Sequence, residues 1–588
     1  MVSYHLSPYV HFIESHLIPN ASQYGVFHQL TGEVLQPNQR VRSLLFAAGV
    51  GSQISFNYPD LEHLGEDGVQ ICKLIEEEFL VPQGHDLLSS FLGRIVVRPL
   101  QNPAVAYRSD NRSMLLVRLS MSGRAYSPRR DELPTIIEEE IPPLATEIFM
   151  LADGTKTLRE IFERQGRAGG ENLLEDRGFR DAVEFLSDQQ RQLIKLTSQP
   201  DDLVDPFKPV NLVPRDLYHS SRWNEQSPVS AEPIIDFHLH GIADASWEFD
   251  QIEPTVNHCF RFPSEVLGGL DYGSRFCLST LCSEVLPLLG QSDRLEVLEV
   301  GGGTGSFARS FILQARELTA ARHNGIDCNY HILDLSPALI QSQRGLLSQL
   351  LPVTNHFQQD ATAFDLPGHK FDLIIANEVI ADFPVASVWR NSNDESASEA
   401  HQRTARRTAW LGDGAGYVEK YNLADETAPD SFLVNAGAFR FIERAWEHLA
   451  PGGTLIISEY GTAQSYPAQS YHLNHEEFSI HFGYLAACAA GVGFDSRLRT
   501  LKEFLELDDQ VLVLNGREEH ISCLNHVLEK FGVRLPYAVI TRKEFEERCQ
   551  GIAQRIGLTG FSFSPLWRGH HFGPRIDDFM VLTMNRPW

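Results

Sequence analysis

The sequence feature that most constrains the fold is LEVLEVGGGTGSF, from Leu295 to Phe307. A short apolar run carries Glu299 near its end and opens directly into a glycine-rich turn. Glycines let the backbone turn tightly and approach a ligand, and the start of the following helix offers free N–H groups. This order of strand, turn and helix is typical of a nucleotide-type cofactor cradle in a doubly wound α/β fold, with Gly301, Gly303 and Gly305 in the turn.

Three further segments follow in the order that such a fold requires. The apolar run HILDLSP ends in Asp334, an acid that can accept hydrogen bonds from two ribose hydroxyls. Asp360 follows a short expected strand, and an Asp in this place commonly contacts the adenine amine. The buried-type strand FDLIIAN then opens into Asn377 and Glu378 at the carboxyl edge of the sheet, where α/β sites lie. Together these segments predict a Rossmann-like domain with a mostly parallel sheet that binds S-adenosyl-L-methionine through Glu299, Gly301, Gly303, Gly305, Asp334, Asp360 and Asn377.

Length and charge limit the partners of this chain. Its 588 residues exceed one ordinary domain, and its net charge is −27. Nucleic acid and anionic membranes require a basic surface, so neither is expected as the main partner, whereas a basic or neutral peptide fits. The same charge could equally serve solubility alone. Eight cysteines without a CxxC pair indicate neither a structural zinc nor a disulfide framework, which favours a cytoplasmic location.

The pattern along the chain predicts four parts. Residues 1–95 form a small winged-helix-like α+β module, and residues 96–198 form a second one with strands before three helices. Residues 199–230 contain five prolines and are expected to form an extended linker. Residues 231–588 form the α/β domain, in which the polar stretch 390–414 is an insertion that acts as a lid or is disordered.

The second module resembles a known family at ATEIFMLADGTKTLREIF, residues 145–162. A helix, a "DGT-x-T" turn, a second helix and a third closing helix are similar to the PqqD-like peptide-recognition domain of enzymes that modify ribosomally made peptides. The resemblance implies that a leader peptide adds a strand to the sheet edge and packs on the third helix. A purely structural winged-helix appendage is the alternative.

The α/β domain resembles the MidA-type methyltransferases, which include a mitochondrial complex I assembly enzyme that methylates a protein arginine. NEVIADFPV at 377–385 is similar to the family segment "NE-x-x-D-A-x-P-V", and SEYG at 458–461 stands where the family has "I-D-Y-G". SIHFGYLAACAAGVGF at 479–494 resembles a family helix, although the family Asp is His481 here. The glycine turn also departs from the family pattern "G-P-G-x-G-T-L".

The predicted chemistry depends on the acceptor of the methyl group. Arginine is protonated at any working pH, so a carboxylate must hold and orient it. Glu378 is the first candidate, and Asp382, four residues on, could complete a bidentate clamp if both lie on one helical turn. A neutral acceptor would need a base, for which His481 or His475 could serve. His238 and His240 alternate on one strand face as metal ligands would, but no matching ligand cluster follows, so no metal is expected.

These observations favour a methyltransferase that modifies a side-chain nitrogen, preferably of arginine, in a precursor peptide captured by the N-terminal module. One alternative is methylation of a folded protein or small molecule, with the N-terminal region as a dimerisation or lid module; a homodimer is compatible with the sequence. Another is an inactive scaffold, which the joint presence of the glycines and acids disfavours.

Overall fold

The computed structural model comprises two compact units, which are described separately. Unit 1 contains Met1–Ser227 and Leu512–Gly573, and unit 2 contains Pro228–Val511 and Pro574–Trp588. Among the described residues, no helix combines the length and the apolar character that a membrane span requires. The structure describes residues 2–588 except 16–22, 36, 50–53, 57–64, 83–90, 99–103, 109–113, 120–134, 165–175, 189–190, 192, 199–237, 240–261, 288–293, 321–326, 349, 351–352, 391–409, 425–427, 473–474, 509, 516–517, 537 and 567–575.

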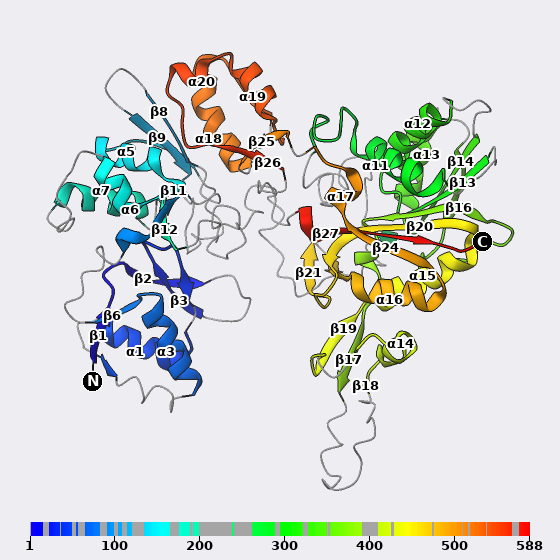
Figure 1. Cartoon of the computed structure of the whole chain (residues 1–588), viewed down its shortest axis with the longest axis horizontal. Coiled ribbons are helices and arrows are strands. Elements are labelled where there is room, and N and C mark those ends of the chain that lie inside the picture. Colours follow the sequence, from blue (N-terminus) through cyan, green and yellow to red (C-terminus); the bar gives the residue numbers. More distant parts are fainter. Residues whose placement is uncertain are drawn as a thin grey trace, which may run out of the picture. The chain divides into compact units, whose positions relative to one another are not determined.

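Unit 2 is built on one mixed, mostly parallel sheet with the strand order β15-β14-β13-β16-β20-β27-β24 (Figure 1). The strands from β15 to β20 pair in parallel, whereas β27 runs antiparallel to both of its neighbours. The short strand β23 (Ile480–His481) pairs in parallel with the end of β20 and is not part of this strand order. The bounds are β13 Arg294–Val300, β14 Asp327–Asp334, β15 Val353–Gln358, β16 Phe371–Asn377, β20 Leu449–Thr462, β24 Asp495–Thr500 and β27 Phe579–Asn585.

Apolar runs explain why this sheet forms the core of unit 2. The central strands are buried on both faces and read as continuous hydrophobic segments, as parallel strands do. Helices cover both faces, with α11, α12 and α13 on one side and α15 and α16 on the other (Figure 1). These helices are α11 Tyr272–Thr280, α12 Ser306–Ala320, α13 Pro337–Leu347, α15 Ala436–His448 and α16 Phe482–Val492. The predicted α/β fold of this region is confirmed.

The predicted insertion after β16 is flanked by a small antiparallel sheet with the order β18-β17-β19. Residues 391–409 of that insertion lie outside the described residues, so its role as a lid stays a prediction. The elements of this part and of the hairpin that follows are β17 Ala386–Arg390, β18 Trp410–Leu411, α14 Ala415–Tyr421, β19 Ser431–Val434, β21 Gln469–His472 and β22 His475–Phe478.

The first part of unit 1 combines two small antiparallel sheets, β5-β1-β6 and β2-β3-β4, with two helices. Buried Val26, Phe79 and Leu80 belong to its core, together with apolar side chains of the helices. The elements are β1 Val2–Leu6, β2 Val10–Ser15, β3 Gln23–His28, β4 Val34–Leu35, α1 Gln39–Gly49, β5 Ile54–Phe56, α3 Glu66–Glu76 and β6 Leu80–Pro82.

The second part of unit 1 contains the three predicted helices in the predicted order. They are α5 (Pro143–Leu151), α6 (Leu158–Arg164) and α7 (Arg177–Ser187). The expected turn lies at the start of strand β11 (Asp153–Thr157), where Gly154 has a φ of +80° and the backbone N of Thr155 donates to Oδ1 of Asp153 at 3.0 Å. Strands β11 and β12 (Lys195–Thr197) flank β7 (Ile95–Val97) in one sheet. These elements agree with the expected helix order, while the winged-helix classification stays a prediction.

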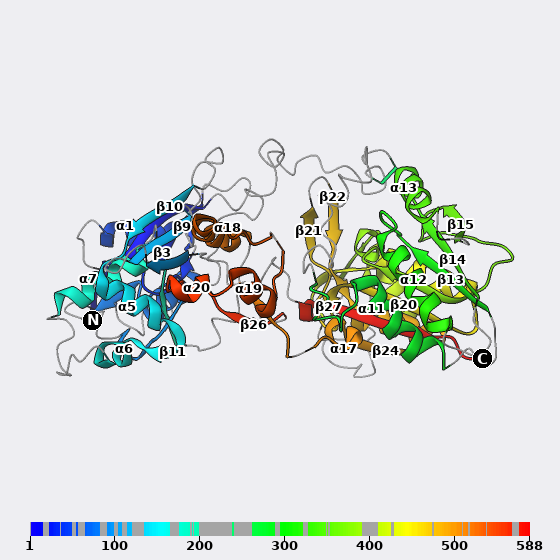
Figure 2. The same ribbon diagram turned by 90° about the horizontal axis from the view of Figure 1, so that it is seen from above.

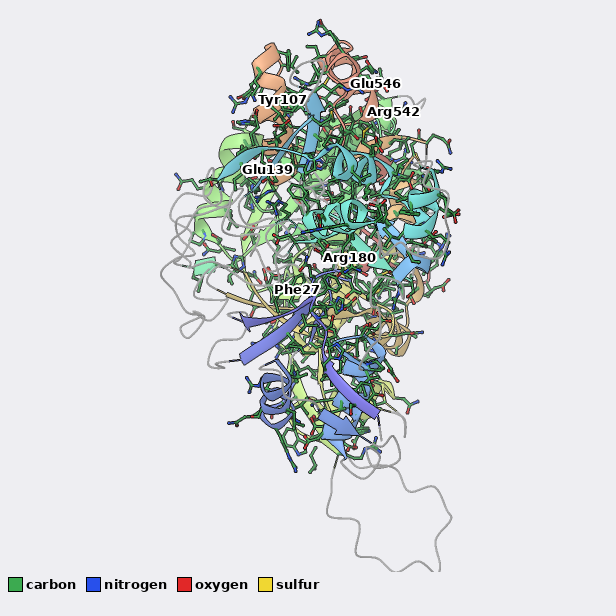
Figure 3. The ribbon with its side chains drawn as sticks, turned by 90° about the vertical axis from the view of Figure 1, so that its left-hand side faces the viewer. Phe27, Tyr107, Glu139, Arg180, Arg542 and Glu546 are labelled. Carbon is green, nitrogen blue, oxygen red and sulfur yellow. The ribbon has the colours of Figure 1, made fainter. Side chains whose placement is uncertain are left out.

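The third part of unit 1 joins two distant segments of the chain. Strands β8 (Ala104–Arg108) and β9 (Met114–Leu119) bury one face against apolar side chains of 512–573, and α18 (Glu518–Leu528) lies beside both strands (Figure 2; Tyr107 of β8 is labelled in Figure 3). The sequence predicts 231–588 as one domain, but residues 512–573, between β24 and β27, group with unit 1 because they complete this core. The other helices and strands of this part are β10 Ile136–Glu140, β25 Leu512–Leu514, α19 Arg542–Cys549, α20 Ile552–Arg555 and β26 Phe563–Pro565. Helix α17 (Leu501–Leu505) belongs to unit 2.

Candidate functional site

A cavity of about 540 Å³ lies in unit 2 where β13, β14 and β16 end. Its volume is within the usual range of about 300–1,000 Å³ for cofactor and ligand sites. The glycine turn and α11 complete its wall. The carboxyl ends of parallel strands therefore meet here as the sequence predicted.

The glycine turn needs its glycines for two different reasons. Gly301 and Gly303 line the cavity with φ angles of +71° and +50°, a region that other residues avoid. A Cβ at Gly301 would lie 2.5 Å from Cγ2 of Val379, so the turn is packed against the segment that follows β16. Gly305 (φ +91°) does not belong to the cavity lining, and a Cβ there would lie 3.2 Å from the backbone of Gln343 in α13. Gly305 thus permits close helix packing.

Two buried acids lie at the ends of β13 and β14. Glu299 accepts a hydrogen bond of 3.1 Å from Oη of Tyr330, and burial raises the pKa of its carboxyl to about 8. Asp334 accepts hydrogen bonds from the backbone N of Ser336 at 2.9 Å and from Nε2 of Gln343 at 2.8 Å, and burial raises its pKa as well. Both carboxyl groups line the cavity, and their role in cofactor binding stays a prediction.

Asp360 lies at the same opening, in the segment that follows β15. One of its oxygens accepts a hydrogen bond of 2.7 Å from the backbone N of Thr362. Both residues line the cavity. The structure thus brings Asp360 together with Glu299 and Asp334.

A hydrogen-bonded chain orients the side chain of Glu378. Oη of Tyr272, which is buried on α11, donates to Oδ1 of Asn377 at 2.9 Å, and Nδ2 of Asn377 donates to Oε1 of Glu378 at 3.3 Å. Glu378 has a φ of +54°, and its backbone N donates to the carbonyl of Ser458 at 2.8 Å. A left-handed conformation at a residue other than glycine is costly and is typical of functional sites. Sequence reasoning missed Tyr272, because it precedes the glycine turn by about 30 positions and no motif marks it.

Asp382 also lines the cavity, but its partner differs from the prediction. The predicted helical turn is absent between Glu378 and Asp382, because the left-handed Glu378 is followed by a short 3-10 turn, Ile380–Asp382. Oδ2 of Asp382 lies 3.1 Å from Nε2 of His238, which lines the same cavity. The sequence suggests no role for His238 other than that of a metal ligand. The described residues contain no group of His, Cys, Asp and Glu side chains that could hold a metal. His240 lies outside the described residues.

The structure does not bring His481 to the cavity. Its Nδ1 accepts a hydrogen bond of 3.2 Å from the backbone N of Tyr484, so it caps α16. Its ring stacks on the ring of Tyr484 with 3.8 Å between centroids, and burial lowers its pKa to about 4. We therefore interpret His481 as the N-terminal cap of α16 and not as a base of the cavity. The side chain of His475 lies outside the described residues.

The described lining of the cavity is acidic. It includes six carboxyl side chains and neither lysine nor arginine. Glu299, with its pKa of about 8, is mostly uncharged at neutral pH, but the remaining carboxyl groups favour a cationic ligand. The six carboxyl groups belong to Asp271, Glu299, Asp334, Asp360, Glu378 and Asp382.

These residues fit S-adenosyl-L-methionine, whose methyl group is carried on a positive sulfonium. The glycine cradle admits no Cβ at Gly301, the start of α12 lies at the cavity, and Asp334 and Asp360 both line it. Asp334 and Asp360 would be the residues that hold the ribose and the adenine of such a cofactor. The acids supply negative charge for the sulfonium. Bound there, the cofactor would supply an electrophilic methyl group.

Comparisons with known proteins agree with this fit. Residues 277–475 match the model of a family described as "Putative S-adenosyl-L-methionine-dependent methyltransferase". No curated protein matches the chain.

Solved structures of low sequence identity are also similar to this chain. An uncharacterised protein from Burkholderia thailandensis is 18% identical, with 53% of this chain and 80% of that chain covered and a TM-score of 0.32. A protein of the same superfamily and organism, bound to S-adenosyl-homocysteine, is 17% identical, with 55% and 78% covered and a TM-score of 0.30. Phosphoethanolamine N-methyltransferase 2 of Haemonchus contortus, in complex with S-adenosyl-L-methionine, is 13% identical, with 60% of each chain covered and a TM-score of 0.28.

The family match supports the prediction of a methyltransferase for the part of unit 2 that carries the cavity. It confirms S-adenosyl-L-methionine as the cofactor, since the matched family depends on it.

Proposed function

We propose that unit 2 transfers a methyl group from S-adenosyl-L-methionine to a basic side-chain nitrogen, with arginine favoured, of a ribosomally made precursor peptide. The observation that carries this proposal is the acidic cavity, which presents six carboxyl groups and no lysine or arginine among its described lining residues. The cofactor has a net charge of only one positive unit, because its carboxylate offsets one of its two cationic groups, the sulfonium and the ammonium. A second cation is therefore favoured in the acceptor position.

Glu378 is the group best placed to hold a guanidinium. A carboxylate can receive two parallel N–H donors from arginine, which fixes both position and direction. Asn377, itself held by the hydroxyl of Tyr272, donates to one oxygen of Glu378, so the carboxylate is oriented before the acceptor arrives. Methyl transfer depends chiefly on such positioning, because the sulfonium is already activated.

The proposed peptide substrate rests on the second part of unit 1. Its helices α5, α6 and α7 follow one another as in the PqqD-like resemblance, with β11, β7 and β12 forming a small sheet beside them. A leader peptide added to an edge of this sheet would tether the core peptide to the same chain as the methyltransferase site. Tethering raises the effective concentration of the acceptor without any new contact at the cavity.

The test is co-expression of the chain with a short peptide encoded beside its gene, followed by intact-mass spectrometry of that peptide. The proposal predicts a mass increase of one CH₂ or a multiple of it, located by fragmentation on arginine. Glu378→Gln should abolish the increase. Glu447→Gln is the matched control, because Glu447 lies on the exposed face of α15 outside the cavity lining and pairs with Arg444.

Two other results would change the assignment. Methylation of lysine or histidine would keep the N-methyltransferase and replace the acceptor. An unmodified peptide in the presence of measurable S-adenosyl-homocysteine binding would refute the peptide substrate and favour a folded protein or a small molecule.

A further inference from the structure

We infer that His238 and Asp382 form the proton-accepting pair of the methyl-transfer reaction; this inference rests on the proposed function. Nε2 of His238 lies 3.1 Å from Oδ2 of Asp382, and both residues line the acidic cavity. Both side chains are partly accessible, with 17% and 16% of their surface exposed. A proton delivered to this pair can therefore pass on to solvent.

The reaction requires such a pair because methylation of a cationic nitrogen releases a proton. The acceptor nitrogen bonds to the methyl carbon while the bond between that carbon and sulfur breaks, and the electron pair of the broken bond stays on sulfur. An N–H bond of the acceptor breaks as well, and its electron pair stays on nitrogen. Nδ1 of the neutral His238 accepts this proton, and the imidazolium that forms is held by its Nε2–H, which donates to Asp382, so charge and atoms balance.

Acidic side chains lie near His238. Asp382 contacts the imidazole directly, and Asp334 from the end of β14 is close enough to interact with it electrostatically. Glu378 lines the same cavity. Carboxylates around an imidazole stabilise the imidazolium.

The position of His238 in the chain separates it from the matched family. The family match begins at residue 277, whereas His238 precedes it and reaches the cavity from a segment before α11. Asp382 lies inside the matched region and Glu378 lies four residues before it. The proton-accepting pair therefore consists of Asp382, which lies inside the region that matches the family, and His238, which lies outside it.

The first test is independent of any substrate. The shared proton of the His238–Asp382 hydrogen bond should give a downfield proton NMR resonance in the full chain saturated with S-adenosyl-homocysteine. His238→Asn and Asp382→Asn should each remove the resonance, whereas His369→Asn should keep it. His369 is the matched control because it is a half-buried histidine of unit 2 outside the cavity lining. A resonance that survives either of the first two substitutions, or one that wild type lacks, would overturn the pair.

The second test separates proton transfer from binding. With S-adenosyl-homocysteine present, His238→Asn should bind an arginine peptide as wild type does, while Glu378→Gln should lose binding. With S-adenosyl-L-methionine, His238→Asn should lower kcat about 100-fold or more, the usual size of a lost general base. An unchanged kcat, or a loss of peptide affinity equal to that of Glu378→Gln, would refute the inference. If wild type binds the cofactor but methylates no basic peptide, the proposed function fails, and the NMR test still decides whether the pair exists.

Discussion

The glycine turn yields a prediction that separates the cost of backbone strain from the cost of a steric clash. Gly301 and Gly368 have similar left-handed φ angles, +71° and +83°. A Cβ at Gly368 would meet nothing within 4 Å, whereas a Cβ at Gly301 would lie 2.5 Å and 2.8 Å from two side-chain carbons of Val379. Gly301→Ala and Gly368→Ala therefore share the backbone penalty but differ in the clash.

The expected magnitudes follow from these two terms. An alanine in the left-handed region costs about 1–2 kcal/mol, so both variants should lose about that much stability. Overpacking against Val379 adds about 1–3 kcal/mol in Gly301→Ala. If the turn relaxes away from Val379, binding must restore its native shape, and affinity for S-adenosyl-homocysteine should fall about 5- to 140-fold.

The assay is isothermal titration calorimetry with S-adenosyl-homocysteine, combined with urea unfolding of each variant. Gly368→Ala should bind as wild type does, because Gly368 does not belong to the cavity lining. Equal affinities of the two variants for S-adenosyl-homocysteine would refute the argument that the absence of a side chain at Gly301 keeps the cofactor-binding turn in shape.

Three further predictions concern the site and the fold. Tyr272→Phe leaves Oδ1 of Asn377 without its 2.9 Å donor, so kcat should fall about 5- to 30-fold, equivalent to about 1–2 kcal/mol, with little change in cofactor affinity in a radiometric assay. Burial raises the pKa of Glu459 from 4.5 to about 8, so the folded state holds a proton that the unfolded state releases. Stability in urea should therefore decrease from pH 4.5 to about 8, and Glu459→Gln should remove its share of this slope. A fragment of residues 1–227 should bind a hydrophobic dye and resist crystallisation, and adding 512–573 should restore cooperative unfolding, because apolar β8 and β9 are otherwise uncovered.

Each of these predictions has a control and a result that would contradict it. Tyr466→Phe alters a tyrosine whose hydroxyl accepts a 3.2 Å hydrogen bond from Tyr484 outside the cavity, so it should leave kcat unchanged. If the stability of Glu459→Gln decreases with pH as steeply as that of wild type, this carboxyl is already charged in the folded state. A 1–227 fragment that binds no hydrophobic dye would contradict the shared core of unit 1.

The fold of unit 2 could be predicted because its signals are local. A buried apolar strand next to a glycine turn specifies both the strand and the start of the following helix, and Asp334 and Asn377 each end such a strand. Parallel strands bring these ends together whatever the connections between them, so acids and glycines far apart in the sequence meet at one edge.

The rest of the site could not be predicted because it depends on pairings that leave no local pattern. His238 and Asp382 are 144 positions apart, and only the folded chain shows that they meet. His481 has the residue type of a base, but its ring nitrogen accepts the backbone N–H of Tyr484 instead. The segment 512–573 lies between two strands of the unit 2 sheet in sequence but completes the core of unit 1, which no periodicity can reveal.

The most direct test of the central claim is single-turnover transfer of a labelled methyl group from S-adenosyl-L-methionine to matched peptides that contain arginine, lysine or glutamine. We predict transfer to the arginine peptide with release of S-adenosyl-homocysteine, and loss of transfer in Glu378→Gln but not in Glu447→Gln. Transfer to glutamine at the same rate, or undiminished transfer by Glu378→Gln, would contradict the account of an acidic cavity that selects a cationic acceptor.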